Sequence, residues 1–233
     1  MILKNLIKDN RFVLYVVTDD KFLPKDLDSK SIEILKDMVK SSADGGAKVF
    51  QYRAKKMDAY IQIKQAEIVK NECEKNKMVF AINDRADLAY ILDAPILHVG
   101  QEDIPPNYIK SKFPQINIGL STHNKDQVKK SLEISDILDY ISFGPVFGTK
   151  TKENPYPKTG LDDLKWIVRE SNIPVVAIGG INYENLEDVL SSGVRTIAII
   201  SYILEDIKRI REKCEKIVKK AEDIIKKAFD KAQ

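Results

Sequence analysis

The chain has 233 residues, of which 43% are hydrophobic, and its 38 basic side chains nearly balance 35 acidic ones. A net charge of +3 does not indicate the dense basic face that proteins use to bind nucleic acid. No apolar run has transmembrane length, and Lys4, Lys8 and Asp9 interrupt the stretch where a signal peptide would have its apolar core. Two cysteines are too few for a disulfide framework, so we expect a reduced, cytoplasmic protein with one sizeable core.

Short β-branched runs alternate with longer stretches of helical periodicity along the chain. The predicted strands are residues 12–17, 48–52, 78–82, 96–99, 116–120, 140–143, 174–178 and 196–200. The predicted helices are 31–42, 58–76, 85–91, 161–170 and 183–191, with another beginning near 124 and a long one at the end. This pattern predicts an α/β fold, a single (β/α)8 TIM barrel that forms one domain over residues 1–233. An open doubly wound sheet is the alternative.

Polar residues and one glycine pair lie at the C-terminal ends of nearly all of the predicted strands, whereas chance would scatter the polar residues over both ends. They are Gln51, Arg53, Lys55, Asn83, Asp84, Gln101, Asp103, Ser121, His123, Thr149, Thr151, Lys152, Gly179, Gly180 and Ser201. In a parallel barrel the C-terminal ends of all strands open on one face. We therefore predict one functional site at this face.

The loop after the sixth predicted strand passes through Gly144-Pro145 and then reads TKTK over residues 149–152. Glycine lets a backbone approach a ligand closely, and hydroxyl and ammonium groups are hydrogen-bond donors that suit an anion such as phosphate. An ordinary solvated loop is the alternative. The length and polarity of residues 150–158 also make this segment the predicted lid.

Two carboxylates and three cations divide the predicted face by charge. Asp84 and Asp103 follow neighbouring strands and can approach one another, while Arg53, Lys55 and Lys152 can hold a phosphorylated group. Magnesium binds one or two carboxylates together with phosphate oxygens, so this pattern indicates a Mg²⁺ site. The alternatives are that Asp84 is the N-cap of a helix and that Asp103 is a turn residue.

Gly179-Gly180 and Ser201 follow the seventh and eighth predicted strands, where barrels commonly bind phosphate through backbone N–H groups. A second phosphate subsite is therefore predicted there. His98 lies within a strand run, which favours local hydrogen bonding, whereas His123 lies on a strand-end loop and an acid/base role for it stays open. Two distant histidines with no nearby cysteine do not indicate a transition-metal site.

Eight short runs, one at each strand end, are together similar to the thiamine-phosphate synthase (thiamine phosphate pyrophosphorylase) family. They cover Leu14 to Ser201 and read LYVVTDD, FQYRAK, INDRADLA, HVGQEDIP, GLSTHN, YISFGPVFGTKTK, IPVVAIGGIN and IAIIS. The resemblance implies a transferase of thiamine biosynthesis. Such an enzyme transfers the hydroxymethylpyrimidine group from its diphosphate to the nitrogen of hydroxyethylthiazole phosphate. The products are thiamine phosphate and diphosphate, and the mechanism is dissociative.

The resemblance also implies roles for individual residues. Those implied for the pyrimidine and its diphosphate are Gln51, Arg53, Lys55, Asn83, Ser121 and Lys152. Those implied for the thiazole and its phosphate are Thr149, Thr151, Gly180, Ile200 and Ser201. Asp84 and Asp103 would bind Mg²⁺. The implied partners are these two small molecules, without nucleic acid or membrane.

The tail from Glu205 to Gln233 is predicted to be an amphipathic helix that belongs to the barrel. Its apolar positions step by three and four: Ile207, Ile210, Cys214, Ile217, Ala221, Ile224 and Ala228. Packing along the outer helices of its own barrel is one interpretation. Contact with a partner or a second copy is the other, so a homo-oligomer is possible.

Two other functions compete with the synthase. A related thiazole tautomerase resembles the synthase and would use His123 for proton transfer without a complete magnesium and diphosphate set. A non-catalytic barrel that binds thiazole phosphate would use the C-terminal tail as a partner surface. The segments Asn83-Asp84, Gln101–Asp103 and Thr149–Lys152 favour the synthase.

Overall fold

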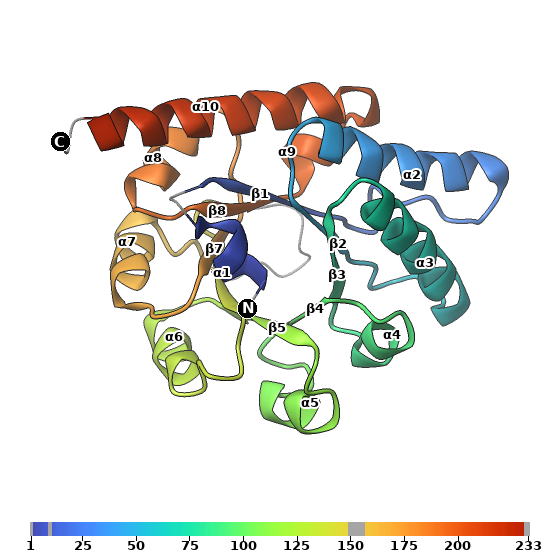
Figure 1. Ribbon diagram of the computed structural model, residues 1–233, viewed down its shortest axis with the longest axis horizontal. Helices are drawn as coiled ribbons and strands as arrows, with labels where there is room; N and C mark the ends of the chain where they lie inside the picture. Colours follow the sequence, from blue (N-terminus) through green and yellow to red (C-terminus); the bar gives the residue numbers. More distant parts are fainter. Residues whose placement is uncertain (1, 9–10, 149–156, 231–233) are drawn as a thin grey trace.

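The computed structural model describes residues 2–8, 11–148 and 157–230, and its eight strands form a closed parallel barrel (Figure 1). The strands are β1 (Val13–Val17), β2 (Val49–Tyr52), β3 (Val79–Asn83), β4 (Ile96–Val99), β5 (Asn117–Thr122), β6 (Tyr140–Phe143), β7 (Val175–Ile178) and β8 (Thr196–Ile199). Each strand pairs with the next in the sequence, and β8 pairs with β1. The predicted barrel is therefore confirmed, because an open sheet would leave two unpaired edges.

Helices surround the barrel between successive strands (Figure 1). They are α1 (Ile2–Leu6), α2 (Ser29–Asp44), α3 (Ala59–Lys75), α4 (Ala86–Ile91), α5 (Pro106–Lys112), α6 (Lys125–Leu132), α7 (Leu161–Glu170), α8 (Leu186–Ser191), α9 (Ser201–Leu204), the 3-10 turn η2 (Ile207–Arg209) and α10 (Ile210–Asp230). The predicted helix ranges do not include α1, α5 or α9. Within the described part of the chain, no helix combines the length and apolar character needed to span a bilayer.

Side chains alternate between the barrel interior and the layer under the helices, as strands require. The interior cluster consists of Leu3, Val13, Tyr15, Val17, Val49, Ala81, Ile96, Tyr140, Val176 and Ala198. The outward-facing residues of the same strands, such as Phe50 and Phe143, pack in a larger cluster against the helices. Burial on both sides explains why the strands are so rich in apolar residues.

Helix α1 covers the end of the barrel at which the strands begin (Figure 1). Leu3 is fully buried among the interior side chains. Its backbone N–H donates to Oδ2 of Asp139, the residue before β6, at 3.1 Å. This contact joins the first turn of the chain to the barrel, so the interior is closed at this end by a hydrophobic side chain and a buried hydrogen bond.

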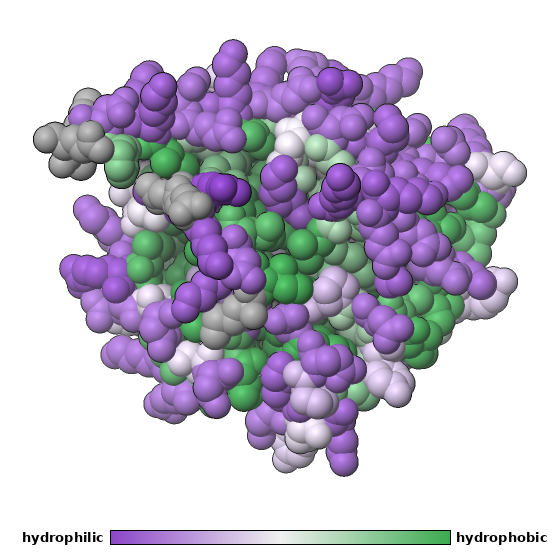
Figure 2. All heavy atoms as spheres, viewed as in Figure 1, coloured by the Kyte–Doolittle hydropathy of each residue, from purple (hydrophilic) through white to green (hydrophobic). Residues whose placement is uncertain are grey.

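Helix α10 packs against α2 and α8, beside the seam between β1 and β8. Its buried residues are Ile210, Lys213, Cys214, Ile217 and Ala221, and its outer face is hydrophilic along the upper edge of Figure 2. A side chain at Gly45, just after α2, would overlap Cβ of Cys214 and lie 2.7 Å from the carbonyl oxygen of Arg211. Glycine therefore permits the close approach of the two helices.

The described tail differs from the predicted helix in where its buried face begins and ends. The long helix starts at Ile210, after α9 and η2, and not at Glu205. Ile207 is 36% exposed and Ala228 is exposed, so only the middle of the predicted seam is buried. This burial supports packing of the tail on its own barrel, while pairing with a second copy stays a prediction.

Replacing Ile217 by alanine is expected to lower the free energy of unfolding by about 3 kcal/mol, because the side chain is fully buried and its removal leaves a cavity. Chemical denaturation followed by circular dichroism measures the change. Phe229→Ala is the control, because Phe229 lies on the same helix and is 56% exposed. Equal effects of the two changes would show that α10 is not held by its buried face.

Candidate active site

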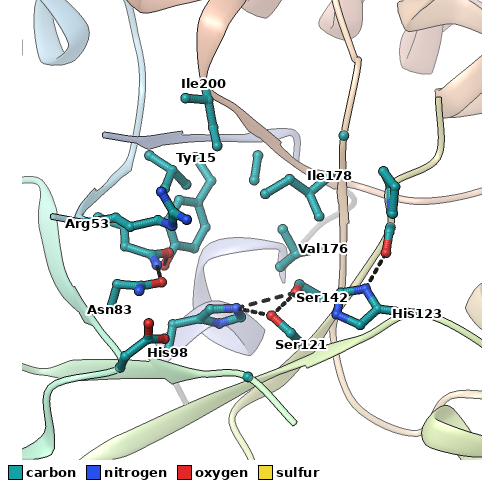
Figure 3. Close-up of a pocket in the computed structure, with 18 of the residues that line it drawn as sticks. Tyr15, Arg53, Asn83, His98, Ser121, His123, Ser142, Val176, Ile178 and Ile200 are labelled. Atoms are coloured by element: carbon teal, nitrogen blue, oxygen red, sulfur yellow. Dashed lines mark hydrogen bonds between the residues drawn. The ribbon is translucent and has the colours of Figure 1, made fainter. Parts of the chain in front are cut away.

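One pocket opens at the C-terminal ends of the strands, and most of the predicted site residues line it (Figure 3). Those present are Gln51, Arg53, Lys55, Asn83, Asp84, Asp103, Ser121, His123 and Ile200. They come from β2, β3 and β5 and from the segments that follow β2, β3, β4, β5 and β8. The predicted convergence of separate strand ends on one site is therefore what the structure shows.

An adjoining hollow contains the remaining predicted residues that the structure describes. Gly180 and Ser201 line it, and it shares Gly179 and Ile200 with the first pocket. Gly179 and Gly180 have φ angles of +104° and +68°, a conformation that favours glycine. This turn and the start of α9 bring backbone groups to the edge of the pocket.

Thr149, Thr151 and Lys152 lie outside the described residues, as does most of the predicted lid over residues 150–158. Their predicted contacts with phosphate and diphosphate stay predictions. The described residues on either side do place the two ends of this loop. Val146 donates its backbone N–H to the Ile178 carbonyl at 2.9 Å, and Thr159 donates its own to the Pro145 carbonyl at 2.8 Å. The loop therefore starts and ends beside the pocket.

Asp84 and Asp103 lie side by side in the pocket, although they come from different loops. The Asp84 backbone has a φ of +61°, and Arg85 is the N-cap residue of α4, so the alternative of Asp84 as that cap is wrong. Asp103 Oδ2 accepts a hydrogen bond from the backbone N–H of Gly100 at 2.7 Å. Burial raises the pKa of Asp103, and the nearby charge of Asp84 raises it further.

The carboxylate pair has the chemistry of a magnesium site. Its ligands would be oxygen atoms, which Mg²⁺ prefers, and the repulsion between the two carboxylates is the kind that a divalent cation relieves. A cation already lies there, because the ammonium of Lys55 is 2.8 Å from Asp84 Oδ2. Among residues 2–8, 11–148 and 157–230, no group of three or more His, Cys, Asp or Glu residues could hold a metal. A magnesium ion bound by these two carboxylates would take its other ligands from water or substrate.

The segment after β1 holds the cationic loop after β2 in position. Asp19 forms an ion pair with Arg53, and both side chains are largely buried. The Asp20 carboxylate accepts the backbone N–H of Lys55 at 2.9 Å and that of Lys56 at 2.9 Å. These acidic residues were not among the predicted site residues. They orient Arg53 and Lys55 before any ligand binds.

His123 lines the pocket, and one nitrogen of its ring is hydrogen bonded to the backbone after β6 (Figure 3). Its Nδ1 donates to the Gly144 carbonyl, and its backbone N–H donates to Oε1 of Gln127 at 2.7 Å. A carbonyl oxygen can only accept, so this contact identifies the Nδ1–H form of the ring. This hydrogen bond fixes the orientation of the His123 ring against the loop that follows β6.

Comparisons with known proteins agree on one family. A family model described as thiamine monophosphate synthase matches residues 14–203. The chain belongs to the thiamine monophosphate synthase family. The thiamine-phosphate synthase of Persephonella marina is 40% identical over 196 residues, which are 83% of this chain and 88% of the relative. That of Hydrogenobaculum sp. (strain Y04AAS1) is 37% identical over 207 residues, which are 88% of this chain and 92% of the relative.

A solved structure with a similar fold carries a name from the same family. The thiamine phosphate pyrophosphorylase from Pyrococcus furiosus has a TM-score of 0.77 and 30% sequence identity with this chain. The match covers 91% of this chain and 96% of that structure. The predicted thiamine-phosphate synthase, a transferase with a (β/α)8 barrel, is therefore confirmed at the level of the thiamine monophosphate synthase family.

The prediction for this member of the thiamine monophosphate synthase family included Gln51 and Asn83 but missed other residues of the polar floor of the pocket. Tyr15, Tyr140 and Ser142 line it from β1 and β6, and His98 lines it from β4. As predicted, His98 is hydrogen bonded locally: its Nε2 lies 2.8 Å from Ser121 Oγ (Figure 3). The sequence could have indicated these four residues, because alternate residues of a strand point to the same side and all four lie at inward-facing positions.

Proposed function

We propose that this chain joins a hydroxymethylpyrimidine diphosphate to a hydroxyethylthiazole phosphate and releases diphosphate. The observation that carries the proposal is the arrangement of one pocket, which has an uncharged polar floor and a charged rim. Gln51 and Asn83 belong to the floor, while Arg53, Lys55 and the Asp84–Asp103 pair belong to the rim. Such a gradient suits a substrate with a polar ring at one end and a diphosphate at the other.

The pyrimidine diphosphate would bind along this gradient. Gln51 is 4% exposed and presents its amide from the barrel interior, so it would meet the pyrimidine ring. Arg53 and Lys55 are oriented by Asp19 and Asp20 and would bind the diphosphate. In the family pattern Asn83, Ser121 and Lys152 complete this subsite.

Asp84 and Asp103 would hold Mg²⁺, which when bound supplies positive charge to the diphosphate oxygens. The Lys55 ammonium, now 2.8 Å from Asp84, would then turn from the carboxylate to the diphosphate. Arg53 has several N–H donors, so it can keep its pair with Asp19 and still donate to a phosphate oxygen. These contacts strengthen as negative charge grows on the leaving group, which favours the transition state over the ground state.

The thiazole phosphate would bind at the adjoining hollow. Gly180, Ser201 and the backbone near Ile200 would receive its phosphate, together with Thr149 and Thr151. Ile178 and Ile200 line both hollows and give an apolar wall between the two phosphate positions. With both substrates bound, this wall would limit the access of water to the region where the thiazole nitrogen meets the pyrimidine methylene group.

The reaction needs no nucleophile from the protein. The bond from the pyrimidine methylene carbon to oxygen breaks, and its electron pair leaves with diphosphate. The aminopyrimidine ring stabilises the resulting cation until the lone pair of the thiazole nitrogen forms the new carbon–nitrogen bond. Both cysteines are buried in the core away from the pocket, and burial raises the pKa of the Cys214 thiol to about 12.

The direct test mixes the purified full chain with both substrates and Mg²⁺ and measures diphosphate and thiamine phosphate. We expect equal amounts of the two products, and none when magnesium is chelated or when the pyrimidine diphosphate is omitted. Conversion between thiazole phosphate tautomers without diphosphate release would support the tautomerase instead. Binding of thiazole phosphate without any turnover would support the non-catalytic function.

A further inference from the structure

A chain of buried hydrogen bonds crosses the barrel interior below the pocket. At one end, Gln51 Nε2 donates to Asn83 Oδ1 at 2.7 Å, and the Tyr15 hydroxyl donates to Gln51 Oε1 at 2.9 Å. The two contacts use opposite sides of the Gln51 amide. In the structure the Gln51 nitrogen faces Asn83 and its oxygen faces Tyr15, and turning the amide over would reverse both hydrogen bonds.

The chain of hydrogen bonds continues through a second tyrosine, Tyr140, to His98. The hydroxyl oxygens of Tyr15 and Tyr140 are 3.0 Å apart, and the Tyr140 hydroxyl is 2.9 Å from Nδ1 of His98. On the other side of the same ring, His98 Nε2 is 2.8 Å from Ser121 Oγ. Side chains from β1 to β6 are thus connected without a break.

Counting protons from this orientation of Gln51 gives the chain of hydrogen bonds a direction. Each neutral phenol has one proton to donate, and Tyr15 donates its proton to Gln51 Oε1. The Tyr15 oxygen must then accept from Tyr140, so Tyr140 has no proton left for His98. His98 Nδ1 must therefore carry a hydrogen and donate it to Tyr140, and Nε2 of the neutral ring must accept from a serine hydroxyl, of which Ser121 Oγ at 2.8 Å lies nearer than Ser142 Oγ at 3.4 Å.

Both phenols are neutral in this environment. Tyr15 and Tyr140 are each 1% exposed, and burial raises the pKa of both hydroxyls well above their usual range. The ring of Tyr140 also has little room to move. It is stacked on His98 with a centroid distance of 5.4 Å, and a side chain at Gly119 on β5 would overlap it. The hydroxyl is therefore held where the chain needs it.

We propose that Tyr15 and Tyr140 are positioning residues that fix the amide orientation of Gln51 and hold His98 as its Nδ1–H tautomer. The consequence for catalysis rests on the function proposed above. Gln51 would present the same amide edge to every incoming pyrimidine. Ser121 would donate its proton to His98 and face the pocket with oxygen lone pairs, so it would contact an amino group of the pyrimidine and not the anionic oxygens of the diphosphate in the same subsite.

The tautomer can be measured directly, because the chain contains only two histidines. Long-range ¹H–¹⁵N correlation spectra of the ligand-free, ¹⁵N-labelled full chain at neutral pH distinguish a protonated ring nitrogen from one with a free lone pair. His123→Gln assigns the two rings. We expect His98 to carry its hydrogen on Nδ1, and a hydrogen on Nε2 would overturn the proposal.

Tyr140→Phe tests the relay, because it removes the hydroxyl and keeps the stacked ring. We expect His98 to leave the pure Nδ1–H form and KM for the pyrimidine diphosphate to rise about fivefold to tenfold, the equivalent of one net hydrogen bond. The change in kcat should be smaller, about threefold at most. An unchanged tautomer together with an unchanged KM would refute the relay.

Tyr52→Phe is the matched control. Tyr52 is also a buried strand tyrosine, but its hydroxyl bonds to Gln65 on α3, outside the barrel interior. It should change neither the His98 tautomer nor KM. If Tyr140→Phe does not fold, Tyr15→Phe removes the next hydroxyl of the chain and should have the same effects. The expected tautomer in a protein that makes no thiamine phosphate would refute the proposed function and leave the relay intact.

Discussion

Asp84→Asn is expected to lower the rate of thiamine phosphate formation at least about a hundredfold, the usual effect of losing one preorganised electrostatic group. The change removes half of the negative charge that would hold Mg²⁺ and also the ion pair with Lys55. Asparagine is chosen because Asp84 has a φ of +61°, which asparagine tolerates and alanine does not. The loss therefore reports on charge and not on backbone strain. Steady-state assays of diphosphate release measure it.

The control for this prediction is Asp87→Asn. Asp87 lies three residues further on, in α4, and pairs with Arg85 outside the pocket, so its charge should not affect turnover. Calorimetry should show weaker Mg²⁺ binding by Asp84→Asn and unchanged binding of thiazole phosphate. Normal turnover by this variant would remove Asp84 from the magnesium site.

Gly179→Ala is expected to lower the free energy of unfolding by about 3–5 kcal/mol, the sum of a strained backbone and an overfilled site. Gly179 has a φ of +104°, where an L-residue is strained. A Cβ there would also overlap the backbone of Pro145 in the loop after β6. Both effects act at the wall between the two hollows, so binding of both substrates should weaken as well. Thermal and chemical unfolding curves measure the stability change.

Gly148→Ala is the companion variant. Gly148 is part of the same loop region, but a Cβ there would have no atom within 4 Å among the residues that the structure describes, and its φ is not positive. Its stability should stay within about 0.5 kcal/mol of the parent chain, as at ordinary surface positions. A similar loss in both variants would mean that the contact with Pro145 is not what makes Gly179 necessary.

Strand positions could be predicted well because burial on two sides leaves a strong pattern in the sequence. The strands β4 and β6 begin and end at the predicted residues, and the others differ by one or two residues. Parallel strands buried between an interior and a helix layer must be apolar and β-branched, so each appears as a short run. Since parallel strands open on one face, the gathering of Gln51, Asp84 and Asp103 followed from the fold.

Short helices could not be predicted in the same way. Helix α1 has five residues, and its stability comes from Leu3 entering the barrel, a tertiary contact that no local pattern reveals. No helix was predicted at α5, although Pro106 is its first residue and proline is favourable at the first position of a helix. In both cases packing against the barrel decides the conformation.

The polar floor was missed for a different reason. Tyr15 and Tyr140 lie inside apolar runs, where an aromatic residue is expected to be a core side chain, and both are indeed buried. Their hydroxyl partners come from other strands, so they become visible only when the barrel closes. Asp19 and Asp20 were missed because an acidic pair after a strand also fits an ordinary turn.

The placement of α1 determines how molecules reach the interior. Because Leu3 and Asp139 close one end, every ligand must enter and leave through the opposite opening. On the function proposed above, a pyrimidine ring that binds against Gln51 would therefore bind before the second substrate and leave after it. The barrel interior thus opens at one end, and the depth at which each substrate binds would set the order of binding.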